Sequence, residues 1–175
     1  MLAAVSLTVS TTEANEGLRY GPICGGPHGD YFSGADKVEP GTIVKEVTLN
    51  GAERVNGITI VALPPGATVP FTFHAGGYGG EPTRLKLGAG EYITSVEYHA
   101  HKHDETQHTR IFYLQLSTNK NKTIHAGQQK GDVCMDEAPY GYQLSSFCGF
   151  QGDELDMAGA IWTSVDKDPP IIAIP

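Results

Sequence analysis

The chain has 175 residues, 39% of them hydrophobic, which is enough to enclose one core but short for two ordinary domains. Its formal charge of −8 argues against a nucleic-acid partner and an anionic membrane surface, because phosphate binding needs clustered Lys and Arg. No run of 18 apolar residues occurs, so no membrane insertion is expected.

The N-terminal residues, MLAAVSLTVSTTEA, are small and apolar but have no basic segment before them. They fit either a shortened secretion signal or a flexible leader, and we favour a secreted protein. We assign residues 1–19 to this leader or extension, residues 20–165 to a single domain and residues 166–175 to a tail. Adjacent prolines in the tail argue against a central strand there.

The body of the chain predicts an all-β fold. Short runs rich in Val, Ile, Thr, Tyr and Phe are separated by Gly- and Pro-rich breaks, and no long stretch has a helical period. Ten such runs are expected to form strands: 42–50, 55–63, 68–74, 83–87, 91–99, 109–118, 122–126, 132–135, 142–150 and 157–165.

Three cysteines allow one disulfide and one free thiol. Cys134 and Cys148 lie on two predicted strands joined by a turn-rich segment, which suits a cross-strand bridge. A bridge from Cys24 to Cys148 remains open as an alternative.

Two glycine-rich loops are related in sequence. Residues 25–30 read GGPHGD and residues 76–81 read GGYGGE. Glycine lets another molecule approach the main-chain N–H groups, so such a loop either binds an oxygen-rich ligand or simply makes a tight hairpin. The repetition favours a pseudo-symmetric fold.

An acidic turn follows a strand near the C-terminus, where Gly152 precedes Asp153, Glu154 and Asp156. Carboxylates at a turn either accept hydrogen bonds from sugar hydroxyls or cap the turn itself. They are unsuited to glycoside hydrolysis, which needs two carboxyls on opposite sides of the scissile bond. No nucleophile or phosphate-binding motif occurs either, so we expect no catalytic residues and no enzyme.

Histidines alternate in the segment EYHAHKHDETQH, at His99, His101 and His103. Imidazoles on one face of a strand can bind zinc or copper, but metal sites usually collect ligands from separate elements. We interpret this segment as a polar loop and expect neither a metal nor another cofactor.

In this order, the motifs GPICGGPHGDYF, HAGGYGGEPTRLKLGAGEYITSVEYH, RIFYLQLSTNKNKTIHAG and FCGFQGDELDMAG resemble the jacalin-related lectins. The resemblance covers residues 20–165. It implies a β-prism of three four-stranded antiparallel Greek-key sheets with pseudo-threefold symmetry. It also implies a metal-free sugar site in which Gly29, Asp153 and Glu154 contribute backbone N–H groups and Asp156 binds hydroxyls through its carboxylate.

The chain departs from the family pattern in its acidic loop, which is about three residues shorter than the usual GFxGRxGxxLD. A second site would combine Gly80 with Glu53 and Asn56. These two residues occupy the positions at which such a site requires two aspartates, so we expect it to be weak or absent. The galactose-binding branch needs a chain cleaved before the first glycine loop, and this chain continues through Gly25. The resemblance therefore implies mannose or glucose.

Together these features predict a lectin that binds terminal mannose- or glucose-type sugars on glycans or glycoproteins reversibly and without a metal. Shallow polar sites bind weakly, so avidity would need several sites, and we expect a homo-oligomer. The alternative is a β-prism that has lost sugar binding and serves as a protein-interaction module.

Overall fold

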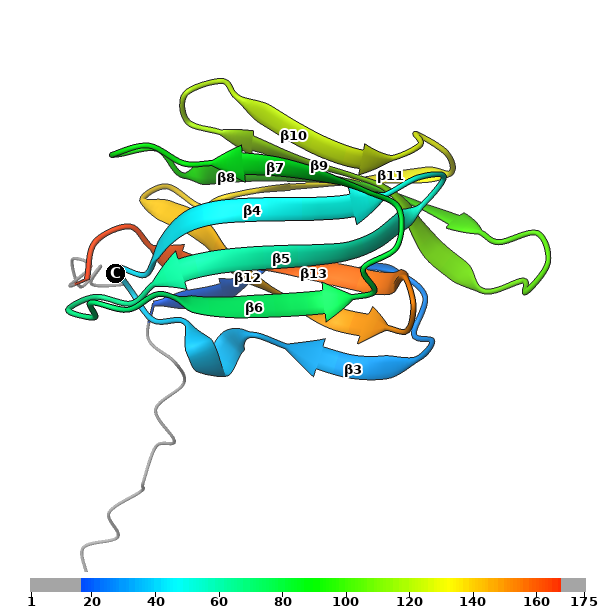
Figure 1. Cartoon of the computed structure of the whole chain (residues 1–175), viewed down its shortest axis with the longest axis horizontal. Coiled ribbons are helices and arrows are strands. Elements are labelled where there is room, and N and C mark those ends of the chain that lie inside the picture. Colours follow the sequence, from blue (N-terminus) through cyan, green and yellow to red (C-terminus); the bar gives the residue numbers. More distant parts are fainter. Residues whose placement is uncertain (1–16, 168–175) are drawn as a thin grey trace, which may run out of the picture.

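The computed structural model, which describes residues 17–167, is built on three long antiparallel hairpins (Figure 1). The first joins β4 (Ile43–Gly51) to β5 (Val55–Leu63), the second joins β8 (Ile93–Lys102) to β9 (Thr109–Thr118), and the third joins β12 (Tyr142–Gln151) to β13 (Leu155–Ser164). These six strands correspond to six of the ten predicted strands.

Shorter strands flank each hairpin. In one sheet β6 (Phe71–Gly76) pairs with β5 and β7 (Glu81–Lys86) with β4. In the next, β10 (Thr123–Gly127) pairs with β9 and β11 (Asp132–Glu137) with β8. In both of these sheets, the strands numbered in chain order lie side by side in the order 4-1-2-3, which is a Greek key.

The third sheet takes its flanking strands from the beginning of the chain. β1 (Leu18–Tyr20) and β2 (Cys24–Gly25) both pair with β13, and β3 (Asp30–Ser33) pairs with β12. Since β1 and β2 follow one another along the same neighbour, they are two parts of one interrupted strand. The expected β-prism of three four-stranded antiparallel sheets is confirmed. A single 3-10 turn, Ala35–Lys37, follows β3.

The three sheets bury one main core between them, and a smaller cluster of Leu18, Val38, Cys148 and Ile161 is separate from it. Along β5, Ile58, Ile60 and Ala62 are all fully buried, as expected of a strand with alternate residues on one face. Trp162 of β13 is 1% exposed, and its indole Nε1–H donates to Asp136 Oδ2 of β11 over 2.9 Å. This bond joins two sheets, and burial raises the pKa of the Asp136 carboxyl.

The expected boundary at residue 20 falls within β1, because Leu18 and Arg19 already pair with β13. Most of the expected leader and the tail from residue 168 onward lie outside the described residues. Within residues 17–167, no helix has the length and apolar character needed to cross a bilayer.

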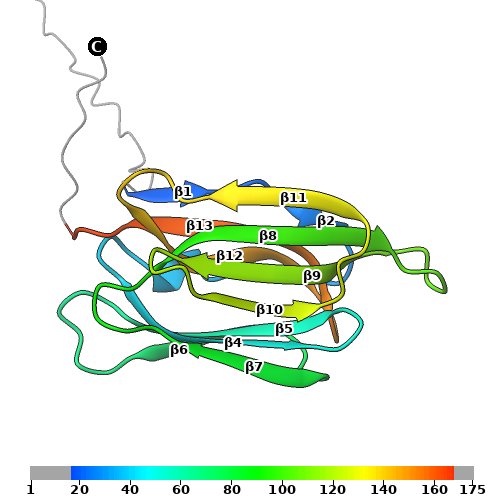
Figure 2. The ribbon, with the colours of Figure 1, turned by 90° about the horizontal axis from the view of Figure 1, so that it is seen from above.

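The predicted Cys134–Cys148 disulfide is wrong. Cys24 of β2 bonds to Cys134 of β11, with 6.4 Å between their Cα atoms, and Cys148 is a buried free thiol. The prediction assumed that the two strands pair, but β11 pairs with β8 rather than with the following strand, β12. Cys148 instead packs in a separate small cluster with Leu18, Val38 and Ile161. Figure 2 shows β2 beside β11 along one edge of the molecule.

Candidate sugar-binding site

The three hairpins turn at the same end of the prism, and a glycine loop packs against each turn (Figure 1). In every loop a first glycine lies against one carbonyl and a second, four residues later, against another. Both have positive φ, and a Cβ at either position would overlap that carbonyl. The three pairs are Gly25 and Gly29, Gly76 and Gly80, and Gly127 and Gly131.

The third of these loops, residues 127–131, was not predicted. It reads GQQKG, and its polar middle conceals the relation to the two glycine-rich copies. A signal was nevertheless present, because Gly25, Gly76 and Gly127 recur at intervals of 51 residues. The structure therefore extends the predicted twofold repeat to a threefold one.

The first glycine loop and the acidic turn meet as the resemblance implied. Gly26 N–H donates to the Asp156 carbonyl over 2.9 Å. A Cβ placed on Gly29 would lie 3.0 Å from Asp156 Oδ2, so the Asp156 carboxylate lies directly beside the Gly29 backbone. Only glycine allows this approach at a φ of 78°.

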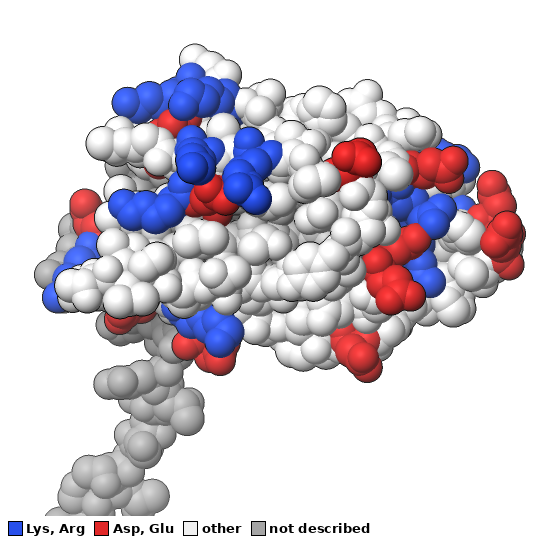
Figure 3. All heavy atoms as spheres, in the orientation of Figure 1, with Lys and Arg blue, Asp and Glu red and all other residues white. Residues whose placement is uncertain are grey.

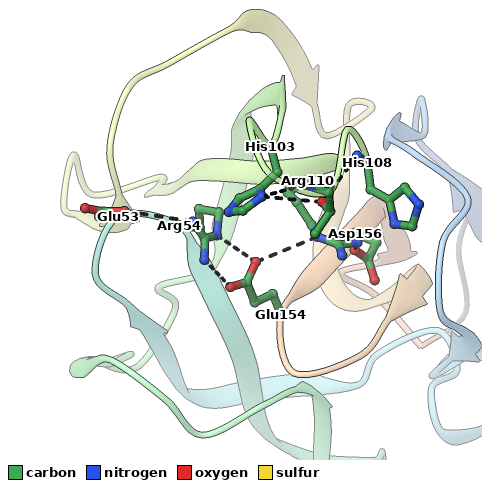
Figure 4. Close-up of polar contacts among 8 residues, drawn as sticks. Glu53, Arg54, His103, His108, Arg110, Glu154 and Asp156 are labelled. Carbon is green, nitrogen blue, oxygen red and sulfur yellow. Dashed lines mark hydrogen bonds and ion pairs between the residues drawn. The ribbon is translucent and has the colours of Figure 1, made fainter.

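Two arginines that the sequence reasoning missed occupy the acidic side of the site. Arg110 of β9 forms an ion pair with Asp156, and its Nε lies 3.8 Å from Glu154 Oε2. Arg54, from the β4–β5 turn, binds Glu154 with two hydrogen bonds, from Nε over 2.7 Å and from Nη2 over 2.5 Å. The hydrogen bonds to Glu154 are the main cause of the raised pKa of Arg54. Figure 4 shows the resulting chain of charges across the three hairpins.

These groups line a cavity of about 270 Å³ that opens at the end of the prism. Asp153, Glu154 and Asp156 of the predicted set all contribute to its wall, and Gly29 lies against Asp156. The acidic loop is held by the Gly152 N–H, which donates to the Glu154 carbonyl over 3.0 Å. The other lining residues are Arg54, His103, Thr106, Arg110 and Gly152.

The β8–β9 hairpin is longer than its two counterparts and projects past them beside this cavity (Figure 1). It places His108 against His28 of the first glycine loop, with the rings stacked at a centroid distance of 4.0 Å and an angle of 7°. Burial, then the neighbouring His108 and Arg110, lower the pKa of His28. The stacked imidazole pair forms a contact between the two loops.

The predicted second site is only partly assembled. Gly80 packs on Gly51, and the Asn56 amide nitrogen faces the adjacent Gly79, at 3.2 Å from a Cβ placed there. The Glu53 carboxylate, however, is 78% exposed and its nearest charged partner is Arg54, at 3.8 Å. Within this loop, Tyr78 stacks on His74 of β6, with 3.9 Å between the ring centroids.

The three alternating histidines separate in space. His99 is buried and hydrogen bonded to Glu97 at 2.6 Å, His101 packs edge-on against Phe112, and His103 lines the cavity. The register of β8 against β9 shifts between His99 and Ala100, where β9 has one extra residue, Phe112. Among residues 17–167, no three His, Cys, Asp or Glu side chains lie close enough to hold a metal ion.

A family model described as a jacalin-like lectin domain matches residues 21–161. The chain belongs to the jacalin-like lectin family. Its family and fold are those of lectins, which bind carbohydrates without catalysing a reaction.

Relatives of this jacalin-like chain include "Secreted RxLR effector protein 19" of Plasmopara viticola. That protein is 31% identical over 162 residues, which cover 90% of this chain and 88% of the relative. The structure of wild-type Malaysian banana lectin is 25% identical, with a TM-score of 0.72 over 85% of this chain and 99% of that one. The structure of the artocarpin–mannopentose complex is 19% identical to this chain and has a TM-score of 0.73. The match covers 84% of this chain and 98% of artocarpin, and it supports the fold.

Proposed function

We propose that this protein is a lectin that binds terminal mannose- or glucose-type sugars, reversibly and without a metal, in the cavity beside Gly29 and Asp156. The observation that carries the proposal is the close approach of the Gly29 backbone to the Asp156 carboxylate. Two segments 127 residues apart thereby place a glycine backbone beside a carboxylate that lines the cavity, and a sugar diol needs both donors and acceptors.

The proposed contacts are those of a polar, shallow site. Backbone N–H groups of Gly29, Asp153 and Glu154 would donate to sugar oxygens, and Asp156 would accept from two hydroxyls. Arg110 already neutralises Asp156, so a bound sugar would share this carboxylate with the guanidinium. Each hydroxyl exchanges water for protein at little net gain, so millimolar affinity for a monosaccharide is expected.

The choice of mannose over galactose rests on two supports. Structures with the same fold include a pineapple lectin named as mannose binding, from Ananas comosus, and the artocarpin complex with mannopentose. In addition, this sequence runs without a break from β1 through Gly25, whereas the galactose-binding branch needs a free amino group at the first glycine loop.

The test is calorimetric titration with methyl α-mannoside, methyl α-glucoside and methyl α-galactoside, with and without EDTA. We expect binding of the first two sugars, unchanged by EDTA, and its loss in Asp156→Asn. Asp36→Asn is the matched control, because it removes an exposed carboxylate in the 3-10 turn, outside the cavity. Binding retained by folded Asp156→Asn, or abolished by EDTA, would refute the proposed site.

A second function, a protein-interaction module, is favoured by one observation: Arg110 and Arg54 already engage both Asp156 and Glu154. The relative named as a secreted effector is compatible with such a role. A glycan array on which the folded wild type binds nothing would support this alternative and overturn the lectin proposal.

We further propose that the protein is secreted and self-associates. Secretion is supported by the name of the Plasmopara viticola relative and by the Cys24–Cys134 disulfide, which persists in oxidising compartments. Self-association is supported only by the need for avidity at weak sites. Light scattering coupled to size exclusion would test it, and a monomer at all concentrations would contradict it.

A further inference from the structure

A basic strip extends from the middle of β7 to the end of the prism opposite the cavity. It consists of Lys45 on β4, Arg84 and Lys86 on β7, and Lys120 and Lys122 in the turn before β10. All five residues are exposed. Cross-strand pairing of Lys86 with Glu46 places β7 beside Lys45. Figure 3 shows a cluster of Lys and Arg on this end of the surface, whereas Asp and Glu are interspersed with Lys and Arg at the other end.

The strip is continuous because two carboxylates connect its parts. Glu46 lies between Arg84, at 3.2 Å, and Lys86, at 3.9 Å. Glu91, whose side chain is 2% exposed, accepts from Lys122 Nζ over 2.8 Å and from the Gly88 N–H over 3.0 Å. Gly88 follows Lys86 by two residues, so the turn and β7 meet at Glu91.

Charge is strongly segregated between this strip and the rest of the chain. Five cations and the two carboxylates beneath them carry a net charge of +3, whereas the remainder of the sequence carries −11. A local surface of opposite sign attracts a ligand that the net charge alone would repel, because screening limits electrostatic interactions to about 8–10 Å at physiological salt.

A simpler role for some of these residues is the protection of sheet edges. β7 and β10 are both edge strands, and Lys on an edge strand hinders pairing with another chain. This role covers Lys86 and Arg84 but not Lys45, which is on the central strand β4, nor Lys120, which is in a turn. The concentration of five cations exceeds what edge protection needs.

We propose that the basic strip is a second carbohydrate site, which binds acidic polysaccharides that carry carboxylate or sulfate groups. Successive outward side chains on β7 are about 6.6 Å apart, so they offer a row of cations to a row of ligand charges. Arg84 pairs with Thr48, which lies three residues or about 10 Å from Gly51 along β4, and Lys45 lies six residues or about 20 Å from Gly51. The strip and the cavity share no residue.

The chemistry of the strip disfavours other polyanions. Binding of single-stranded nucleic acid uses aromatic side chains as stacking platforms, and membrane surfaces take up exposed aromatic and leucine side chains. The exposed aromatic residues among residues 17–167 belong to other segments, namely Tyr20, Tyr31, Tyr78 and Tyr140. A polysaccharide needs only the spaced charges.

The experiment measures binding to immobilised heparin and to polygalacturonate, with neutral dextran as the negative control, at several salt concentrations. The test variant is Lys45→Gln/Lys86→Gln/Lys120→Gln, which leaves the Lys122–Glu91 pair intact. The matched control, Lys37→Gln/Lys102→Gln/Lys130→Gln, removes three exposed lysines elsewhere and reaches the same net charge. We expect the test variant to lose at least about tenfold in affinity and about two units of salt slope, because fewer counterions are released.

Several outcomes would overturn the proposal. The first is that neither immobilised polysaccharide retains the wild type at 50 mM salt. The second is that both triple variants lose the same amount of polysaccharide affinity. The third is that the wild type binds phosphatidylserine vesicles or DNA more tightly than it binds either polysaccharide. Self-association of the test variant with unchanged polysaccharide binding would assign the lysines to edge protection. All titrations are repeated in excess methyl α-mannoside, so the result does not depend on whether the cavity binds sugar.

Discussion

Arg110 of β9 forms an ion pair with Asp156 of β13, across the boundary between two sheets. The Asp156 side chain is 4% exposed and that of Arg110 is 18% exposed. The carboxylate proposed to hold a sugar is thus also part of the internal structure, so stability and binding depend on the same pair.

Arg110→Met is expected to lower the free energy of unfolding by roughly 2–4 kcal/mol, because it leaves a buried carboxylate without its partner. Arg110→Met/Asp156→Asn should recover part of that loss. Urea denaturation of the single and double variants measures the coupling. Arg84→Met, which removes a 61% exposed partner of Glu46, is the control and should cost under about 1 kcal/mol. Additive effects of the two substitutions in the Arg110–Asp156 pair would contradict the coupling.

Gly29→Ala is expected to impair sugar binding and to destabilise the fold more than Gly66→Ala does. Both glycines have positive φ, 78° and 75°, so both substitutions introduce backbone strain of about 1–2 kcal/mol. Only at Gly29 would the added Cβ overlap the Gln151 carbonyl, whereas nothing lies within 4 Å of the same position at Gly66. Thermal denaturation and sugar titration of both variants compare the two effects, and equal destabilisation would show that the first loop can move aside.

Acid stability should depend on Glu91. Its pKa is lowered to about 2, first by the hydrogen bond from Lys122 and then by that from the Gly88 N–H. A carboxyl whose pKa is lower in the folded than in the unfolded protein contributes its full stabilisation above its unfolded pKa of about 4.5. This contribution disappears as the pH falls toward the folded pKa of about 2. Lys122→Met should therefore flatten the rise of melting temperature between pH 2 and 4.5. An unchanged pH profile in this variant would exclude the pair as its source.

Reduction of the Cys24–Cys134 bond should cost about 2–5 kcal/mol, because the bond closes a loop of 110 residues between two sheets. Cys134→Ser tests this by chemical denaturation, and peptide mapping without reductant checks the pairing. Cys148→Ser is the control at a buried thiol whose pKa is raised by its burial. A disulfide-linked peptide containing Cys148 would contradict the structure.

Much of the fold was predictable from local patterns. All ten strands expected from residue 42 onward occur, with ends that differ by a few residues. The missed strands, β1, β2 and β3, have four residues or fewer and lie in a Gly- and Pro-rich segment. Such short strands have no measurable alternation, and they form because β12 and β13 offer edges to pair with.

The site was predictable only on the side that a motif marks. Gly29 and the acids from Asp153 to Asp156 belong to recognisable sequence segments, whereas Arg54 and Arg110 are single cations in unrelated hairpins. No spacing rule connects Arg110 to Asp156, 46 residues later, or Arg54 to Glu154, 100 residues later.

By itself, the sequence determined the ten longer strands, two of the three glycine loops and the family, because alternation, backbone freedom and motif order are properties of neighbouring residues. Only the tertiary structure decided the disulfide partner, the two arginines at the cavity and the basic strip. Each of these depends on which distant strands lie side by side, and strand pairing is set by the burial of a whole sheet face rather than by any local pattern.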